Sequence, residues 1–166
     1  MNILLKSDYG AARLTAGQIL KDPVLFLAFG FGSGLSKYMP GTLGSLAALP
    51  IYFALIQFSH PWLYPLVTVL TVIIGVWLCD KAARKLAVHD FGGIVWDEIA
   101  GILITLYGLP FNPQTVLAGF VLFRLFDIVK PWPIRYLDQH VGGGFGIMLD
   151  DVVAAIFAAV LLRVWL

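Results

Sequence analysis

Long apolar stretches without charged residues dominate the chain. Residues 62–79 hold 18 consecutive positions without a charge, close to the roughly 20 that an α-helix needs to cross a lipid bilayer. Residues 43–58 form a second charge-free stretch, in which Pro50 predicts a kink. Because only residues 59–61 separate the two stretches, the pattern predicts two membrane-crossing helices joined as a hairpin.

Three further apolar stretches carry a few charges near their ends. They cover residues 94–109, 114–129 and 147–166 and are separated by proline-containing turns. An earlier stretch, residues 24–35, is short and rich in glycine, which favours a re-entrant or interfacial segment over a span. The chain is therefore predicted to be an all-α polytopic membrane bundle of about five transmembrane spans, with this short segment near its N-terminus.

Composition supports a membrane protein with one domain, residues 1–166. Hydrophobic residues make up 60% of the chain and charged residues 13%, against about 45–50% and about 25% in soluble domains. The net charge of +1 argues against nucleic-acid binding, which needs a basic face. Cys79 is the only cysteine, so neither an intramolecular disulfide nor a cysteine-based metal cluster can form.

The basic residues predict an orientation in the membrane. They concentrate in the N-terminal segment and in residues 80–93 and 130–146, whereas the links at 59–61 and 110–113 carry none. Because basic loops stay in the cytoplasm, the N-terminus and both basic loops are predicted to be cytoplasmic. The C-terminus is then expected on the opposite side.

Acidic residues lie at the predicted cytoplasmic ends of three spans. Asp97 and Glu98 open the third, Asp127 lies near the end of the fourth, and Asp150 and Asp151 open the fifth. Ionisable groups within membrane spans are costly and usually mark function. Carboxylates crowded together need a cation, and oxygen ligands without a Cys or His cluster favour Mg²⁺, or Mn²⁺ in its place.

A simpler explanation exists for the two acidic pairs. Acids in the first turn of a helix interact favourably with its dipole, by about 0.3–1 kcal/mol each. That effect alone would account for either pair taken singly. It does not account for Asp127, which is near a helix C-terminus where negative charge is unfavourable.

Basic residues accompany Asp127 on the same helix. Arg124, Asp127 and Lys130 are spaced three residues apart, so a continuous helix places them within about 120° of its circumference. One interpretation is an internal salt bridge around Asp127. The other is a site where Asp127 meets a metal or water while Arg124 and Lys130 neutralise an anion.

The glycine-rich stretch at residues 30–45 has features of an anion-binding loop. Lys37, Thr42 and Ser45 lie between its glycines, and Thr42 is predicted to be the N-cap of the first span. A helix N-terminus with exposed N–H groups binds anions, and glycine lets backbone approach a ligand. Glycines that serve helix packing in a membrane give the same pattern.

His89 and Asp90 lie in the loop before the third apolar stretch. A solvated loop histidine and a proton shuttle both fit that position.

Several motifs resemble those of the phosphatidylglycerophosphatase A family of bacterial membrane lipid phosphatases. They are GFGSGLSKYMPGTLGSLAALP at 30–50, HDFGGIVWDEIAGILIT at 89–105, FRLFDIVKPWPIRYLD at 123–138 and GGGFGIMLDDVVAA at 142–155. The resemblance implies Mg²⁺-dependent removal of the terminal phosphate of phosphatidylglycerol phosphate, with one or two ions. It also implies a multi-pass protein of the bacterial inner membrane with its active site facing the cytoplasm, and it suggests no obligate protein partner.

The resemblance and the charge pattern together assign roles to particular residues. Metal ligands are expected among the acids, with catalysis resting chiefly on three of them and phosphate binding on basic and hydroxyl groups. The expected metal ligands are Asp97, Glu98, Asp127, Asp150 and Asp151; the catalytic residues are Asp97, Asp127 and Asp151; and the phosphate-binding residues are Lys37, Thr42, Ser45, Arg124 and Lys130. Both a metal-activated water and an aspartyl-phosphate intermediate fit this set.

Other classes of membrane protein fit the sequence less well. An ion-coupled transporter predicts midplane acids and an internal repeat, and we see no repeat. The histidine-dependent lipid phosphatases need PSGH-like and SR…H motifs, and the CDP-alcohol phosphotransferases need a DG…AR…G…D…D pattern; neither occurs. A non-enzymatic scaffold leaves the clustering of acids unexplained.

Overall fold

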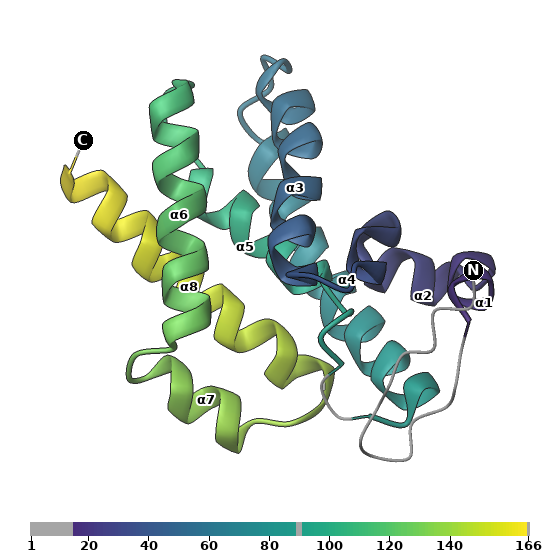
Figure 1. Cartoon of the computed structure of the whole chain (residues 1–166). Coiled ribbons are helices and arrows are strands. Elements are labelled where there is room, and N and C mark those ends of the chain that lie inside the picture. Colours follow the sequence, from purple (N-terminus) through teal and green to yellow (C-terminus); the bar gives the residue numbers. More distant parts are fainter. Residues whose placement is uncertain (1–14, 89–90, 166) are drawn as a thin grey trace.

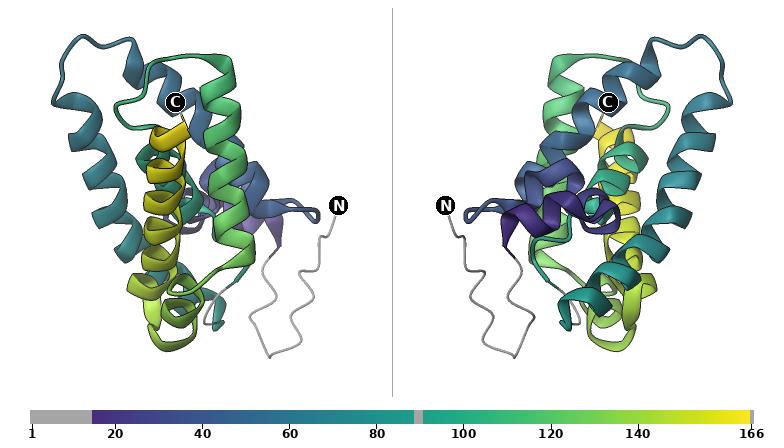
Figure 2. Two further views of the ribbon diagram at one scale, coloured as in Figure 1. Left: turned by 90° about the vertical axis from the view of Figure 1, so that its left-hand side faces the viewer. Right: turned by 90° about the vertical axis from the view of Figure 1, so that its right-hand side faces the viewer.

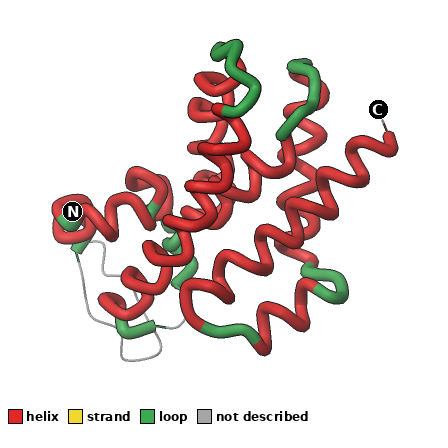
Figure 3. Tube along the Cα trace, turned by 180° about the vertical axis from the view of Figure 1, so that it is seen from behind, coloured by secondary structure: helices red, strands yellow, loops and turns green. Residues whose placement is uncertain are grey.

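The computed structural model describes residues 15–88 and 91–165, and every regular element within them is a helix (Figure 3). This confirms the predicted all-α class. The elements, in chain order, are α1 (Ala16–Lys21), α2 (Pro23–Ala28), the 3₁₀-helix η1 (Gly30–Leu35), α3 (Pro40–Ile56), α4 (Leu63–Leu86), α5 (Trp96–Leu106), α6 (Pro113–Val129), α7 (Ile134–His140) and α8 (Gly143–Trp165).

The five apolar stretches correspond to α3, α4, α5, α6 and α8, but they differ in their capacity to cross a membrane. By length and composition, α4 and α8 are the two candidate spans among the described residues. Helix α3 is apolar but has 17 residues, and α5 has 11, which gives it a length of about 16 Å. The helices are thus confirmed, whereas a bundle of five spans stays a prediction.

Helix α8 is the central element of the fold. It packs against α4, α5, α6 and α7, and Figure 2 shows it running between α4 and α6. Ala154, Ala155 and Ala158 on α8 are fully buried. Small residues of this kind let helix backbones approach closely, which is the usual basis of helix packing in membranes.

Helix α5 is the inner helix, and α3 and α6 stand on either side of it (Figure 1). Eight of its 11 residues are buried. A side chain at Gly101 would place its Cβ 2.3 Å from the Phe123 ring of α6, so the absence of a side chain there is what lets α6 lie against α5. This packing fixes Arg124, the next residue along α6, beside the start of α5.

The glycine-rich N-terminal segment forms two short pieces: α2, which packs against α4, and η1, which packs against α3. Within η1 the backbone leaves helical geometry at Phe31 and Gly32, whose φ values are 59° and 95°. Neither piece is long enough to cross a bilayer; whether the segment re-enters the membrane or lies flat stays a prediction. Asp22 caps α2 and pairs with Lys85 of α4, and this hydrogen bond lowers the pKa of Asp22.

Candidate metal centre and active site

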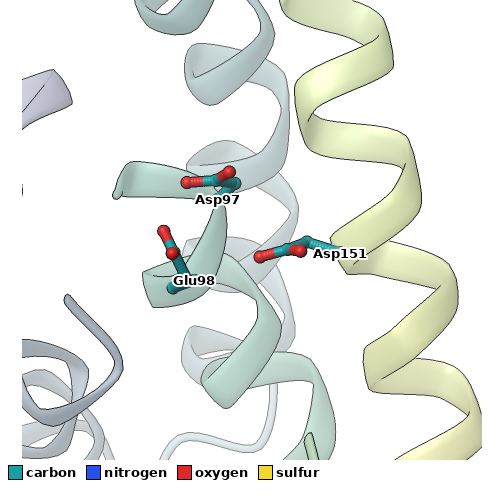
Figure 4. A group of neighbouring side chains, drawn as sticks. All are labelled: Asp97, Glu98 and Asp151. Atoms are coloured by element: carbon teal, nitrogen blue, oxygen red, sulfur yellow. The ribbon is translucent and has the colours of Figure 1, made fainter. Parts of the chain in front are cut away.

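Two acidic side chains stand at the start of α5, and a third faces them from α8 (Figure 4). Asp97 and Glu98 lie in the first turn of α5, and Asp151 lies well inside α8. One carboxylate oxygen from each residue lies within 4.8 Å of the other two. Because Glu98 and Asp151 are only 9% and 3% exposed, the cluster is inside the protein and not on a solvated rim.

The helix dipole explains only one of the two acidic pairs. Asp97 and Glu98 do occupy a first turn, but α8 begins at Gly143 and has no acidic residue in its first turn. The start of α8 is therefore earlier than the predicted residue 147. Because Asp150 and Asp151 lie beyond the reach of the dipole, their burial needs another source of stabilisation.

The start of α5 is held in place from two directions. The backbone N–H of Val95 donates to the carbonyl of Ala28 in α2, at 2.8 Å. The indole Nε1–H of Trp96 donates to the carbonyl of Thr71 in α4, at 3.0 Å. These two hydrogen bonds come from the two residues that precede Asp97, and they fix where the acidic turn begins.

Two basic side chains contact the acids. Arg124 Nη1 lies 2.7 Å from Asp127 Oδ2 and 3.6 Å from Glu98 Oε1, so the salt bridge around Asp127 exists and also extends to the cluster on α5. Lys130 Nζ lies 2.5 Å from carboxylate oxygens of both Asp138 and Asp150. Desolvation lowers the pKa of Lys130, but these hydrogen bonds outweigh it and raise the pKa above the ordinary value, so Lys130 is a fixed positive charge.

A polar cavity of about 150 Å³ brings these side chains together. All five acids singled out in the sequence line it, and so does Lys130. Its lining residues are Gly92, Ile94, Asp97, Glu98, Asp127, Lys130, Asp138, Val141, Gly146, Ile147, Asp150 and Asp151. Six carboxyl groups therefore face two basic side chains, Arg124 and Lys130, which leaves a marked excess of negative charge in a confined space.

Several buried oxygen atoms of the acids have no hydrogen-bond partner among the described residues. They are Glu98 Oε2, Asp150 Oδ1 and Asp151 Oδ2. A buried carboxylate oxygen without a partner is costly, by about 1–3 kcal/mol or more, and a divalent cation would satisfy it. The donor set is all oxygen, which suits hard cations such as Mg²⁺. The residues present therefore fit a metal centre, formed by Asp97, Glu98 and Asp151.

Comparison with known proteins identifies the family of the chain. The family model for phosphatidylglycerophosphatase A matches residues 26–166. The chain belongs to the phosphatidylglycerophosphatase A family. It is therefore an enzyme of the phosphatase class.

Curated relatives cover most of the chain. Phosphatidylglycerophosphatase A of Escherichia coli is 54% identical over 142 residues, which are 84% of this chain and 81% of the relative. The enzyme of the same name from Haemophilus influenzae is 46% identical over 142 residues, 85% and 87% of the two chains. A relative from Bacteroides thetaiotaomicron, 38% identical over 149 residues (86% and 92%), has a provisional name as a phosphatidylinositol-3-phosphatase. No solved structure matches the chain.

One acid of the cavity, Asp138, is missing from the residues selected by sequence. It lies on α7. The sequence pattern predicts a single loop over residues 130–146, which includes this helix. The Asp138 carboxylate contacts Lys130. The signal that could have found it is the phosphatidylglycerophosphatase A motif at 123–138, which ends on this residue. His89 and Asp90 lie outside the described residues.

The glycine-rich stretch reaches the site through Gly41 alone. Helix α3 begins at Pro40 with Met39 as its N-cap, so the prediction of Thr42 as the N-cap is wrong; proline at the first helical position suits that start. Lys37 is exposed, and the Ser45 hydroxyl donates to the Gly41 carbonyl at 2.9 Å. Among the described residues, none of Lys37, Thr42 and Ser45 lines the cavity, so their phosphate-binding role stays a prediction.

The close approach of Gly41 to Glu98 and Arg124 can be tested by substitution. A Cβ there would lie 2.2 Å from Glu98 Oε1 and 2.9 Å from Arg124 Nη2. Gly41→Ala should therefore displace both side chains and lower kcat/KM by up to about 100-fold, the cost of a misplacement of about 1 Å. Gly17→Ala is the matched control, because no atom lies within 4 Å of its Cβ. Equal phosphatase rates in the two variants would contradict the close approach at Gly41.

Proposed function

We propose that the chain removes the terminal phosphate of phosphatidylglycerol phosphate in a Mg²⁺-dependent reaction. The observation that carries the proposal is the buried acidic cluster, whose carboxylate oxygens lie within 4.8 Å of one another and include oxygens without a partner. Uncatalysed hydrolysis of phosphate monoesters is extremely slow, so a very large electrostatic stabilisation is required. A cation held by such a cluster would provide it.

The acids divide into ligands and a candidate base. Asp97, Glu98 and Asp151 would hold the ion through single oxygens, with Asp150 close by. When bound, Mg²⁺ would polarise both the phosphate and the attacking water. Asp127 lines the same cavity. It would take a proton from the water as the water oxygen attacks phosphorus. The bond from phosphorus to the lipid oxygen breaks at the same time, and the lipid oxygen leaves with the bonding electron pair and takes a proton from solvent.

Arg124 and Lys130 would balance the charge of the phosphate. Each already contacts an acid of the site, so both are oriented before substrate binds. The start of α3 also reaches this region, because Gly41 lies against Glu98 and Arg124. The N-terminus of a helix favours anions, which supports a role for the backbone at Gly41 and Thr42 in holding phosphate oxygens.

A direct assay tests the substrate. Purified protein should release inorganic phosphate from phosphatidylglycerol phosphate faster than from phosphatidylinositol 3-phosphate or phosphatidic acid, all with the same short acyl chains. The alternative headgroups matter because a relative carries the phosphatidylinositol phosphatase name. A preference for either alternative would refute the proposed substrate while leaving the metal centre in place.

We also propose that the site faces the cytoplasm of a bacterial inner membrane, as the distribution of basic loops favours. Gln139 on α7, next to the cavity residue Asp138, and Ser59 in the link between α3 and α4 are both exposed. With a membrane-impermeant maleimide, Gln139→Cys should be labelled only in inverted vesicles and Ser59→Cys only in intact spheroplasts. Cys79 is buried, so native background should be low. Labelling of both on one side would refute the predicted orientation.

A further inference from the structure

We propose that an acyl chain of the lipid substrate binds in an apolar groove between α3 and α6, with its phosphate end at Arg124. The inference rests on the proposed function, since it assumes a phosphorylated membrane lipid as substrate. It adds the path by which that lipid reaches a buried polar site: from the side, between two helices.

The groove exists because α3 and α6 both pack on α5 and stand apart from each other (Figure 1). It encloses about 300 Å³, and all its lining residues are apolar. Several of them are open to the surroundings, with exposed fractions of 43% for Leu46, 38% for Phe53 and 65% for Leu117. A groove with this lining is suited to a hydrocarbon chain and not to a polar ligand.

The lining residues form matching stripes on the two helices. On α3 the stripe contains Leu46, Leu49 and Phe53, and on α6 it contains Phe120, Leu117 and Pro113. Spacings of three and four residues keep each stripe on one helix face. Continued by four residues, the stripes reach Thr42 on α3 and Arg124 on α6.

The two ends of the groove differ in character. At one end Gly41 lies against Arg124, which in turn contacts Glu98 and Asp127 of the metal centre. At the other end the rings of Phe53 and Phe111 are in contact, with centroids 5.7 Å apart. Aromatic rings therefore line the far end of the groove, and at the other end the two stripes point toward a positive charge beside the acidic site.

The length of the groove identifies its occupant. The lining of the groove on α3 runs from Leu46 to Phe53. With the continuation of the stripe to Thr42, the path from the site to Phe53 covers eleven residues, or about 16 Å of helix. This is close to half of the roughly 30 Å hydrocarbon thickness of a bilayer, the depth of one leaflet. An acyl chain whose phosphate is at the interface fits that depth, whereas a transmembrane helix from a second copy would need about twice the length.

The experiment uses phosphatidylglycerol phosphate with a photoactivatable diazirine in one acyl chain, bound to the purified full-length protein in detergent micelles. After irradiation, mass spectrometry should find the label concentrated on residues 46–53 and 113–120. Leu117→Trp should reduce that label by about tenfold, since excluding roughly two methylene groups from the groove costs that much affinity. The matched control is Val121→Trp, a replacement on the same helix in a separate apolar groove between α6 and α8; it should not change the label.

Every outcome decides the inference. Label spread evenly over the apolar surface, or equal in the two tryptophan variants, would overturn it. So would efficient disulfide cross-linking of Leu117→Cys to a second copy, because that would make the groove a protein interface. The labelling does not depend on turnover. Label in the groove without phosphate release would refute the proposed function and leave acyl-chain binding in place. Phosphate release without label in the groove would refute acyl-chain binding and leave the proposed function in place.

Discussion

Replacing Asp151 by asparagine should reduce phosphate release by about 1000-fold while leaving the protein folded. The side chain is 3% exposed and contributes one of the three oxygens of the metal centre. Asparagine keeps the shape but loses the charge, which weakens binding of a hard cation and the electrostatic stabilisation that it supplies. The measurement is kcat/KM for phosphatidylglycerol phosphate at saturating Mg²⁺.

The thermal stability of Asp151→Asn without metal should not fall with its activity. In the absence of divalent cations Asp151 lies close to Asp97 and Glu98, and removing one of three like charges relieves repulsion. The thermal midpoint of Asp151→Asn without metal should therefore equal or exceed that of the wild type. Asp22→Asn is the matched control, since Asp22 lies outside the cavity and asparagine can still cap α2. A variant that loses both activity and stability would refute this account of Asp151.

The pattern of hydrophobic positions predicted the helices well and their ends less well. The apolar pattern predicts the last span from residue 147 and leaves residues 142–146 in the preceding loop. In the structure Gly143, Gly144 and Gly146 are part of helix α8. A side chain at Gly144 would lie 2.1 Å from the Val76 carbonyl of α4, so this glycine serves close helix packing. Composition alone does not distinguish a packing glycine from a helix-breaking one.

The sequence predicts the acids of the site that lie within apolar helices, where charged residues are rare. It does not predict the acid that lies in a polar connection. Asp97, Glu98, Asp127, Asp150 and Asp151 stand out because they interrupt apolar helices, and the structure places all of them around one cavity. Asp138 did not stand out, since it lies in a polar connection where acids are common. Its importance depends on α7 folding back so that its carboxylate meets Lys130, eight residues earlier. The charge pattern alone does not predict that contact.

Removal of divalent cations should abolish activity reversibly. The described residues form an all-oxygen cluster with buried oxygens that have no hydrogen-bond partner, and these oxygens are the ligands that a divalent cation would bind. Phosphate release in excess EDTA should fall below about 1% of the initial rate, because the electrostatic stabilisation is lost. Addition of Mg²⁺ beyond the chelator should restore it, and Mn²⁺ should substitute.

A binding measurement separates the metal centre from catalysis. Mg²⁺ at about 100 times its dissociation constant should stabilise the folded wild type by about 2.7 kcal/mol, visible as a rise in the thermal midpoint. Asp22→Asn should show the same rise, whereas Asp151→Asn should show little of it, because one of its three ligands is gone. Two results together would mean that the acids act without a metal: phosphate release that persists in EDTA, and a thermal midpoint that does not change when Mg²⁺ is added. The buried carboxylates would then have to share protons, and activity would fall as rising pH removed them.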